Sequence, residues 1–283
     1  MGHDKLRKFA ENETFSCLLQ PSAQELLADG YFHLRDHAVK GCWAQRFGNG
    51  RPLVLELGCG KGEYTIALAE RDPSRNYIGV DIKGARLWKG AKYATEHALP
   101  NVAFLRTRVE FITAFFAPGE VSEVWLTFSD PQYRSENSRL CSPLFLERYR
   151  SFLKPGGIVH LKTDSRFLHE YARAVCAANK LQVLSCTQDL YNQQVEVQPV
   201  VREVQTFYEQ LFLEQGYPIT YLSFVIDHEG PYVSPKDPEE FDTKAWRAAE
   251  GPRLLFGHDS AETRRQKLHD RAKGEELVKK TEE

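Results

Sequence analysis

Short apolar segments alternate with helix-like segments from residue 52 onward, and this alternation restricts the fold more than any other feature of the chain. The apolar segments are nearly continuous, which is typical of strands buried on both faces of a parallel sheet. We expect strands at 53–57, 76–81, 102–105, 124–128 and 158–163, with possible edge strands at 182–186 and 221–226. The pattern therefore predicts an α/β fold with a largely parallel sheet and helices on both faces.

Three regions differ in composition. Helical segments at 63–70 and 84–98 separate the first predicted strands, and a Pro-Gly turn at 154–157 precedes the fifth. We assign residues 51–227 to one catalytic or binding domain, preceded by a lead-in segment over 1–50 with one or two helices. Residues 228–283 form a charged extension, whose composition is typical of a solvated helix or a disordered segment.

Charge and cysteine content exclude several classes of protein. The chain has 37 Lys and Arg against 39 Asp and Glu, so it lacks a strongly basic coat for nucleic acid, although local basic patches are compatible with this balance. No apolar segment is long enough to cross a bilayer, and the first residues lack the apolar core of a secretory signal. Six scattered cysteines without a CxxC pair argue against a zinc site or a disulfide framework. We expect a cytoplasmic protein with no metal and no membrane partner, as a monomer or a homodimer.

A glycine-rich segment, ELGCGKG at 56–62, joins the first predicted strand to the first helix. Gly58 and Gly60 allow a tight turn and close approach of a ligand to the backbone, and Asp81 ends the next strand, where a carboxylate can hold ribose hydroxyls. The spacing is G-x-G-x-G rather than the G-x-G-x-x-G of dinucleotide folds. Glu56 would repel a pyrophosphate but suits an ammonium or sulfonium group. This favours S-adenosylmethionine (AdoMet) over NAD, with a purely structural glycine turn as the third interpretation.

A second polar segment, FSDPQYRSENSRL at 128–140, begins where the fourth strand is expected to end. Because ligands of open parallel sheets bind outside the carboxyl ends of the strands, Asp130 should lie beside the glycine-rich segment. An Asp-Pro turn is equally compatible with the local sequence. The stretch DPQY is also similar to the D/N-P-P-Y motif of enzymes that methylate exocyclic amines, although Gln132 replaces the second proline.

From about residue 53 to 226 the chain resembles the bacterial tRNA (guanine-N7)-methyltransferases. The motifs VLELGCGKGEYTIALA, YIGVDIKGARL, NVAFLRTR, WLTFSDPQ and FLKPGGIVHLKTD occur in family order. They are followed by Thr206-Phe207-Tyr208-Glu209, which matches the T-x-Y/F-E signature of that family.

The resemblance implies a class I methyltransferase with a Rossmann-like, seven-stranded sheet. It implies methyl transfer from AdoMet to N7 of a guanine in the variable loop of tRNA. The cofactor-binding residues carried over by position are Glu56, Gly58, Gly60, Asp81 and Asp130. Asp130 is also the implied catalytic carboxylate. The implied substrate-binding residues are Arg134, Asp164, Thr206 and Glu209.

Two positions depart from the family pattern. Arg108 stands where the family commonly has an aspartate near the adenine, so Thr107 and Arg108 are both candidates for that contact. The dense basic string after the catalytic motif is reduced to Arg134 and Arg139. Further phosphate contacts would then come from basic residues of the tail at 264–280, for which a solvated tail is the alternative.

Two other functions stay open at this point. A methyltransferase acting on an exocyclic amine of nucleic acid or protein is the second hypothesis, and a nonenzymatic AdoMet- or RNA-binding module is the third. Guanine N7 carries an in-plane lone pair and no proton, so the preferred reaction needs alignment rather than a general base. We therefore expect Asp130 to orient the guanine and to stabilise the cationic methylated ring.

Overall fold

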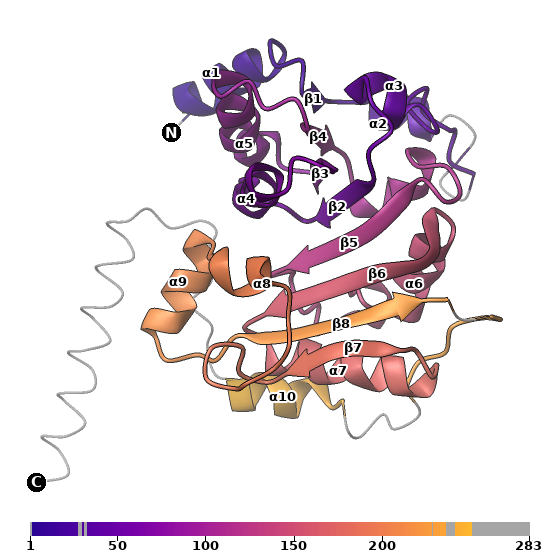
Figure 1. Ribbon diagram of the computed structural model, residues 1–283, viewed down its shortest axis with the longest axis vertical. Helices are drawn as coiled ribbons and strands as arrows, with labels where there is room; N and C mark the ends of the chain where they lie inside the picture. The colour runs from indigo at the N-terminus through magenta and orange to yellow at the C-terminus, as the bar shows by residue number, and fades with distance from the viewer. Residues whose placement is uncertain (1, 28–29, 31–32, 228, 236–240, 251–283) are drawn as a thin grey trace, which may run out of the picture. The chain divides into compact units, whose positions relative to one another are not determined.

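Residues 2–27, 30, 33–227, 229–235 and 241–250 are described by the structure, a computed structural model of the chain. In these residues eight strands form one sheet in the order β1-β4-β3-β2-β5-β6-β8-β7 (Figure 1). The strands are β1 (Leu18–Leu19), β2 (Leu53–Leu57), β3 (Asn76–Asp81), β4 (Val102–Arg106), β5 (Val121–Thr127), β6 (Leu153–Thr163), β7 (Val183–Thr187) and β8 (Thr220–Ile226). All neighbours pair in parallel except β8, which is antiparallel to both β6 and β7.

The five strands predicted for the parallel part of the sheet are all present, and three details differ from expectation. The sheet has one strand more than the seven expected: β1, in the lead-in segment, where Leu18 and Leu19 pair with β4. The apolar segment at 221–226 lies inside the sheet as β8, so only β7 is an edge strand at that end. Residues 154–157 do not form a turn before β6 but lie within it. They form a bulge, because Val121 pairs with Leu153 and Glu123 already pairs with Ile158.

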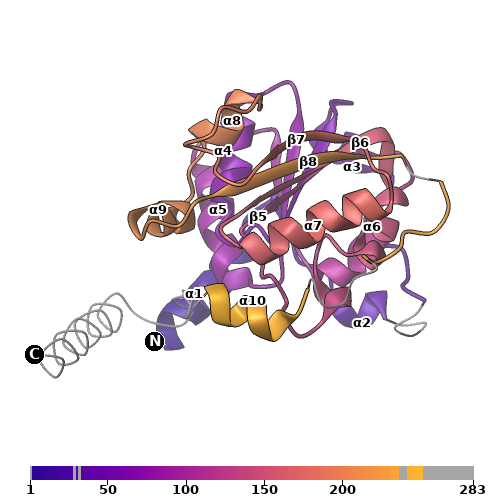
Figure 2. The same ribbon diagram turned by 90° about the horizontal axis from the view of Figure 1, so that it is seen from below.

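Helices cover both faces of the sheet, as Figure 2 shows in a view from below. Alternate strand residues face opposite layers: Leu53, Leu55 and Leu57 belong to one hydrophobic cluster, and Val54 belongs to the other. The first cluster is covered by α3 (Trp43–Phe47), the 3₁₀-helix η1 (Val109–Ala114), α6 (Pro143–Arg150) and α7 (Arg166–Ala178). The second is covered by α4 (Glu63–Arg71), α5 (Gly84–Glu96) and α8 (Pro199–Glu203).

Helix α7 illustrates why the sequence forms these elements. Ser165 caps it by accepting a hydrogen bond from the Leu168 amide at 3.1 Å, which satisfies one of the free N–H groups of the first turn. Leu168, Tyr171 and Val175 recur at helical spacing and are all buried. The helix therefore forms where a local cap and an apolar face coincide.

The lead-in segment packs on the sheet domain. Helix α1 (Gly2–Asn12) lies along α5, where the Trp88 indole N–H donates to Glu11 at 2.6 Å and the Asn12 side chain donates to the Gly84 carbonyl at 3.0 Å. The short α2 (Ala23–Leu26) follows β1. The segment is thus tied to the start of α5, directly after the end of β3.

The chain divides into two compact units, Met1–Thr243 and Lys244–Glu283, and α10 (Thr243–Glu250) begins at the boundary. Residues after the last strand still pack in the first unit. The Tyr232 amide donates to Glu147 at 2.9 Å, and the Phe241 ring contacts Tyr171 edge-on. The predicted tRNA contacts at 264–280 lie outside the described residues. No helix in the described ranges is both long and apolar enough to span a membrane.

Candidate active site

The carboxyl ends of five parallel strands meet at one edge of the sheet. Strand β2 lies between β3 and β5, so the strand order continues to β3 and β4 on one side of β2 and to β5 and β6 on the other. The order therefore reverses beside β2, and ligands of open α/β sheets bind at such a switch point. A residue predicted for the site lies at or just after the end of each of these strands: Glu56 in β2, Asp81 in β3, Thr107 after β4, Asp130 after β5 and Asp164 after β6. The fold therefore brings the predicted residues to one edge.

The glycine-rich loop is held by Asp81. Its Oδ2 accepts a hydrogen bond from the Gly60 amide at 3.0 Å, and its Oδ1 accepts from the Lys83 amide at 2.7 Å. Gly60 has φ +57° and Gly62 has φ +73°, and a Cβ on Gly62 would lie 2.5 Å from the Phe104 ring. Glycine is required at residue 62 both for the backbone angle and for the close packing of the loop on β4.

Glu56 is buried beneath this loop, with 3% of its surface exposed. One carboxylate oxygen accepts from the backbone amide and hydroxyl of Thr65 in α4, and the other accepts from the hydroxyl of Thr127 at the end of β5. Burial raises the pKa of Glu56 to about 7, although these hydrogen bonds act in the opposite direction. The carboxylate thus joins β2, α4 and β5 and changes charge near neutral pH.

The two candidates for the adenine contact differ in position. The Thr107 amide donates to the Asp81 carbonyl at 3.2 Å, and Thr107 is buried. Arg108 is exposed, forms a 3.5 Å ion pair with Glu110, and lies over the Phe111 ring. Thr107 therefore lies beside Asp81, the carboxylate predicted to bind the cofactor, whereas the contacts of Arg108 are with η1.

Asp130 lies on an exposed loop with an unusual backbone. Its Oδ1 accepts a hydrogen bond from the Gln132 amide at 2.9 Å, which closes a short Asx turn. Phe128 and Gln132 have φ of +51° and +48°, a region that residues other than glycine seldom adopt and that is enriched at functional sites. The Phe128 amide also donates to the Lys162 carbonyl at 2.9 Å, which ties the start of the loop to β6.

The two arginines of this loop have different environments. Arg134 is exposed, whereas Arg139 has only 4% of its surface exposed. The Arg139 guanidinium lies 4.7 Å from the centroid of Phe167 and 4.4 Å from that of Tyr171. Arg139 therefore packs against α7, whereas Arg134, the predicted substrate residue, is exposed on the loop.

The predicted substrate residues Thr206 and Glu209 belong to α9 (Phe207–Glu214). Thr206 caps this helix, since its hydroxyl accepts from the Glu209 amide at 3.3 Å. The Glu209 side chain has 0% exposure and forms a 2.7 Å ion pair with Lys162, which is equally buried. Burial raises the pKa of Glu209 and lowers that of Lys162. Glu209 therefore faces Lys162 rather than the solvent. Asp164 is also mostly buried, at 8% exposure.

Several residues of the site are absent from the sequence prediction. Thr65 and Thr127 bind Glu56, and Tyr191 donates to Glu209. Lys162 donates to the carbonyls of Val201 and Val204 at 2.7 and 2.9 Å. The lysine in the apolar segment IVHLKT could have indicated a buried ion pair, because a charged residue at the end of a buried strand needs a partner. Its partner is 47 residues away in sequence, so only the fold identifies it.

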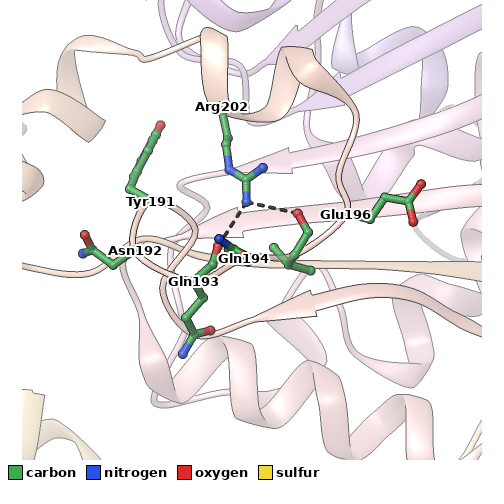
Figure 3. Close-up of a pocket in the computed structure, with 7 residues that line it drawn as sticks. Tyr191, Asn192, Gln193, Gln194, Glu196 and Arg202 are labelled. Carbon is green, nitrogen blue, oxygen red and sulfur yellow. Dashed lines mark hydrogen bonds between the residues drawn. The ribbon is translucent and has the colours of Figure 1, made fainter.

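Figure 3 shows a pocket lined by residues 191–196 and Arg202, and one of these residues, Tyr191, donates to Glu209. Arg202 donates to the backbone carbonyls of Gln193 and Val195 at 3.2 and 3.1 Å and to that of Leu190 at 3.0 Å. The guanidinium holds the loop in place. None of the residues predicted for the active site lines this pocket.

The strand order, the glycine-rich loop and the acidic residues at the ends of neighbouring strands together define a class I methyltransferase with a Rossmann-like sheet. A family model described as "Putative methyltransferase" matches residues 50–222.

Two curated relatives are named tRNA (guanine-N(7)-)-methyltransferase. The protein from Christiangramia forsetii is 49% identical over 226 residues, which cover 79% of this chain and 98% of the relative. The protein from Bacteroides thetaiotaomicron is 45% identical over 243 residues, covering 86% and 93%. Among solved structures, the 16S rRNA methyltransferase KamB shows a TM-score of 0.48 at 17% identity, over 64% of this chain and 92% of that one. This chain belongs to the family of the tRNA (guanine-N(7)-)-methyltransferases, which confirms the resemblance seen in the sequence.

Proposed function

We propose that this protein transfers a methyl group from AdoMet to N7 of a guanine in the variable loop of tRNA. The observation that carries the proposal is the 49% identity to a tRNA (guanine-N(7)-)-methyltransferase along 98% of that protein. We also propose that the reaction takes place in the cytoplasm and that residues 51–227 carry the catalytic machinery. The six free cysteines support a reducing compartment.

The residues at the switch point fit AdoMet. A Cβ built on Gly58 or Gly60 meets no atom within 4 Å, so the loop backbone is open to a ligand on that side. Asp81 supplies a carboxylate at the loop, and Glu56 adds a second negative charge as the pH rises through about 7; such groups suit a cationic sulfonium or ammonium group and ribose hydroxyls. When bound, AdoMet supplies an electrophilic methyl group. We assign its binding to Glu56, Gly58, Gly60, Asp81 and Thr107.

Asp130 is the proposed catalytic residue. Its exposed carboxylate can accept hydrogen bonds from the N1 and N2 edge of a guanine, which would orient N7. No proton has to leave N7, so the carboxylate needs no basic role. The methylated ring carries positive charge, and a nearby carboxylate stabilises that charge as it develops. Arg134, exposed on the same loop, is placed for a phosphate contact.

The test is methyl transfer from labelled AdoMet to a tRNA transcript, followed by chain scission specific for N7-methylguanine. A matched transcript with 7-deazaguanine at the target keeps the Watson–Crick edge but lacks the nucleophilic nitrogen. We expect labelling and scission only with the unmodified guanine. Labelling of the 7-deaza transcript would instead indicate an exocyclic amine as the acceptor, and the absence of labelling in both would favour a binding module.

A further inference from the structure

The Thr206–Glu209 turn is attached to the glycine-rich loop and its helix. Glu63 is the first residue of α4, directly after that loop, and its Oε2 accepts a hydrogen bond from the Phe207 amide at 3.0 Å. The Lys61 ammonium lies 4.9 Å from the centroid of the Phe207 ring. The turn that carries a predicted substrate residue thus contacts the segment predicted to bind the cofactor.

The same turn is attached to the end of β6. The Lys162 ammonium donates to Glu209 at 2.7 Å and to the carbonyls of Val201 and Val204. These contacts connect Lys162 to α9 and to the C-terminal end of α8, and the ammonium also lies 3.5 Å from the Tyr191 hydroxyl. Both charges are completely buried, so loss of one partner would leave the other uncompensated.

The polar contacts of α9 lie at its first turn. The helix has eight residues, too few to be stable alone, and Glu209 is its only buried residue. Figure 1 shows α8 and α9 beside the edge toward which β5 points. Phe212 and Leu213 pack against the second hydrophobic cluster and hold the later part of α9, so the polar contacts at its first turn fix the start of the helix.

We propose that Glu63 and Lys162 are positioning residues that hold the Thr206–Glu209 turn at the active edge, Glu63 through the Phe207 amide and Lys162 through Glu209. The inference rests on the proposed function, because the turn matters as part of the tRNA site. It also assigns Glu209 a role in positioning the turn rather than in touching the guanosine.

Glu63 has a second feature that must be separated from this role. An acidic residue in the first turn of a helix stabilises it through the helix dipole, and Glu63 also pairs with Lys89 at 2.9 Å. Glu63→Gln loses the charge but keeps an oxygen that can accept from the Phe207 amide, whereas Glu63→Ala loses both. Lys89→Ala breaks the ion pair and leaves α9 untouched.

The experiment measures kcat/KM for a tRNA transcript and the Kd for AdoMet in the full chain. We expect Glu63→Ala to lower kcat/KM about tenfold, as for the loss of one hydrogen bond. Glu63→Gln and Lys89→Ala should stay within about twofold of the unaltered protein, and AdoMet affinity should be unchanged in all three. If Glu63→Gln falls as far as Glu63→Ala, or Glu63→Ala does not fall, the positioning role of Glu63 is overturned.

Lys162 needs a paired variant, because Lys162→Met alone leaves a buried carboxylate without its partner. Lys162→Met combined with Glu209→Gln removes both charges together, and we expect it to fold. It should lower kcat/KM for tRNA about tenfold with AdoMet affinity retained. A folded double variant with unaltered kcat/KM would overturn the role of Lys162. If the unaltered protein makes no N7-methylguanine, the proposed function itself fails; if it does and the variants match it, only this inference fails.

Discussion

Three carboxylates at the active edge have different environments, and their expected roles follow from them. Glu56 is buried and bound to two threonines, Asp81 is bound to two loop amides, and Asp130 is exposed in a turn. The first two hold the structure of the proposed cofactor site, so substitutions there affect both stability and binding. Asp130 can be tested for chemistry with little effect on folding.

Asp130→Asn is expected to fold and to bind AdoMet normally but to lose most of its turnover, by about 10²- to 10³-fold. The amide oxygen can still accept from the Gln132 amide, so the Asx turn is retained, while the negative charge is lost. Single-turnover methylation of tRNA, alongside calorimetric titration of AdoMet, measures both properties. Near-normal turnover would show that Asp130 serves only in the turn.

Glu56 should make stability dependent on pH. Its folded pKa of about 7 lies above the ordinary 4.5, so the folded state retains a proton that the unfolded state loses. The resulting stabilisation is fully present below pH 4.5 and is lost as the pH rises through 7. Relative to Glu56→Gln, the unaltered protein should lose about 3 kcal/mol of unfolding free energy across that window. Urea denaturation at several pH values tests this, and a difference independent of pH would contradict it.

At the scale of elements, the loop between β5 and α6 carries two arginines whose environments differ, although the sequence does not distinguish them. Arg139 lies against two aromatic rings of α7, and Arg134 is exposed. The aromatic rings of α7 give Arg139 a packing role, whereas Arg134 stays available for a phosphate contact. The two residues therefore form a matched pair for experiment.

Arg134→Ala should weaken tRNA binding, with a log–log salt slope shallower by about 0.7–0.9, and leave stability unchanged. Arg139→Ala should lower the unfolding free energy by roughly 1–2 kcal/mol through loss of its aromatic contacts and leave the salt slope unchanged. Filter binding across a salt series and chemical denaturation measure the two effects. A reduced slope for Arg139→Ala in folded protein would instead show that Arg139 contacts tRNA phosphate.

At the scale of the whole molecule, the lead-in segment supports the site. Asn12 has 1% of its surface exposed, and its amide donates to the carbonyl of Gly84, where α5 begins. Asn12→Ala should cost about 1–3 kcal/mol of unfolding free energy, because the Gly84 carbonyl loses its buried partner. Glu13→Ala, at an exposed position next to it, is the control and should change stability little. Equal stabilities for the two variants would show that the lead-in segment does not support the sheet domain.

The amino-acid sequence predicts the central sheet and most of the proposed site residues at its carboxyl edge. Continuous apolar segments predict strands because burial on both faces admits few polar residues, and residues that follow parallel strands must meet at one edge. Glu56, Asp81 and Asp130 could be placed there in advance from the glycine-rich segment and the strand ends, whereas Thr107 and Asp164 were assigned through the family resemblance. The family could also be recognised, since its motifs are local stretches in a constant order.

The contacts across that edge, by contrast, become visible only when the distant segments are folded together. The Lys162–Glu209 ion pair, the Glu63–Phe207 contact and the packing of Arg139 join segments that are 28 to 144 residues apart, and no local pattern encodes such pairs. The pairing of Leu18 and Leu19 with β4 was equally invisible, because two residues are too few for a recognisable strand pattern. Local chemistry specifies elements and motifs, whereas the partner of a buried charge depends on how distant elements pack.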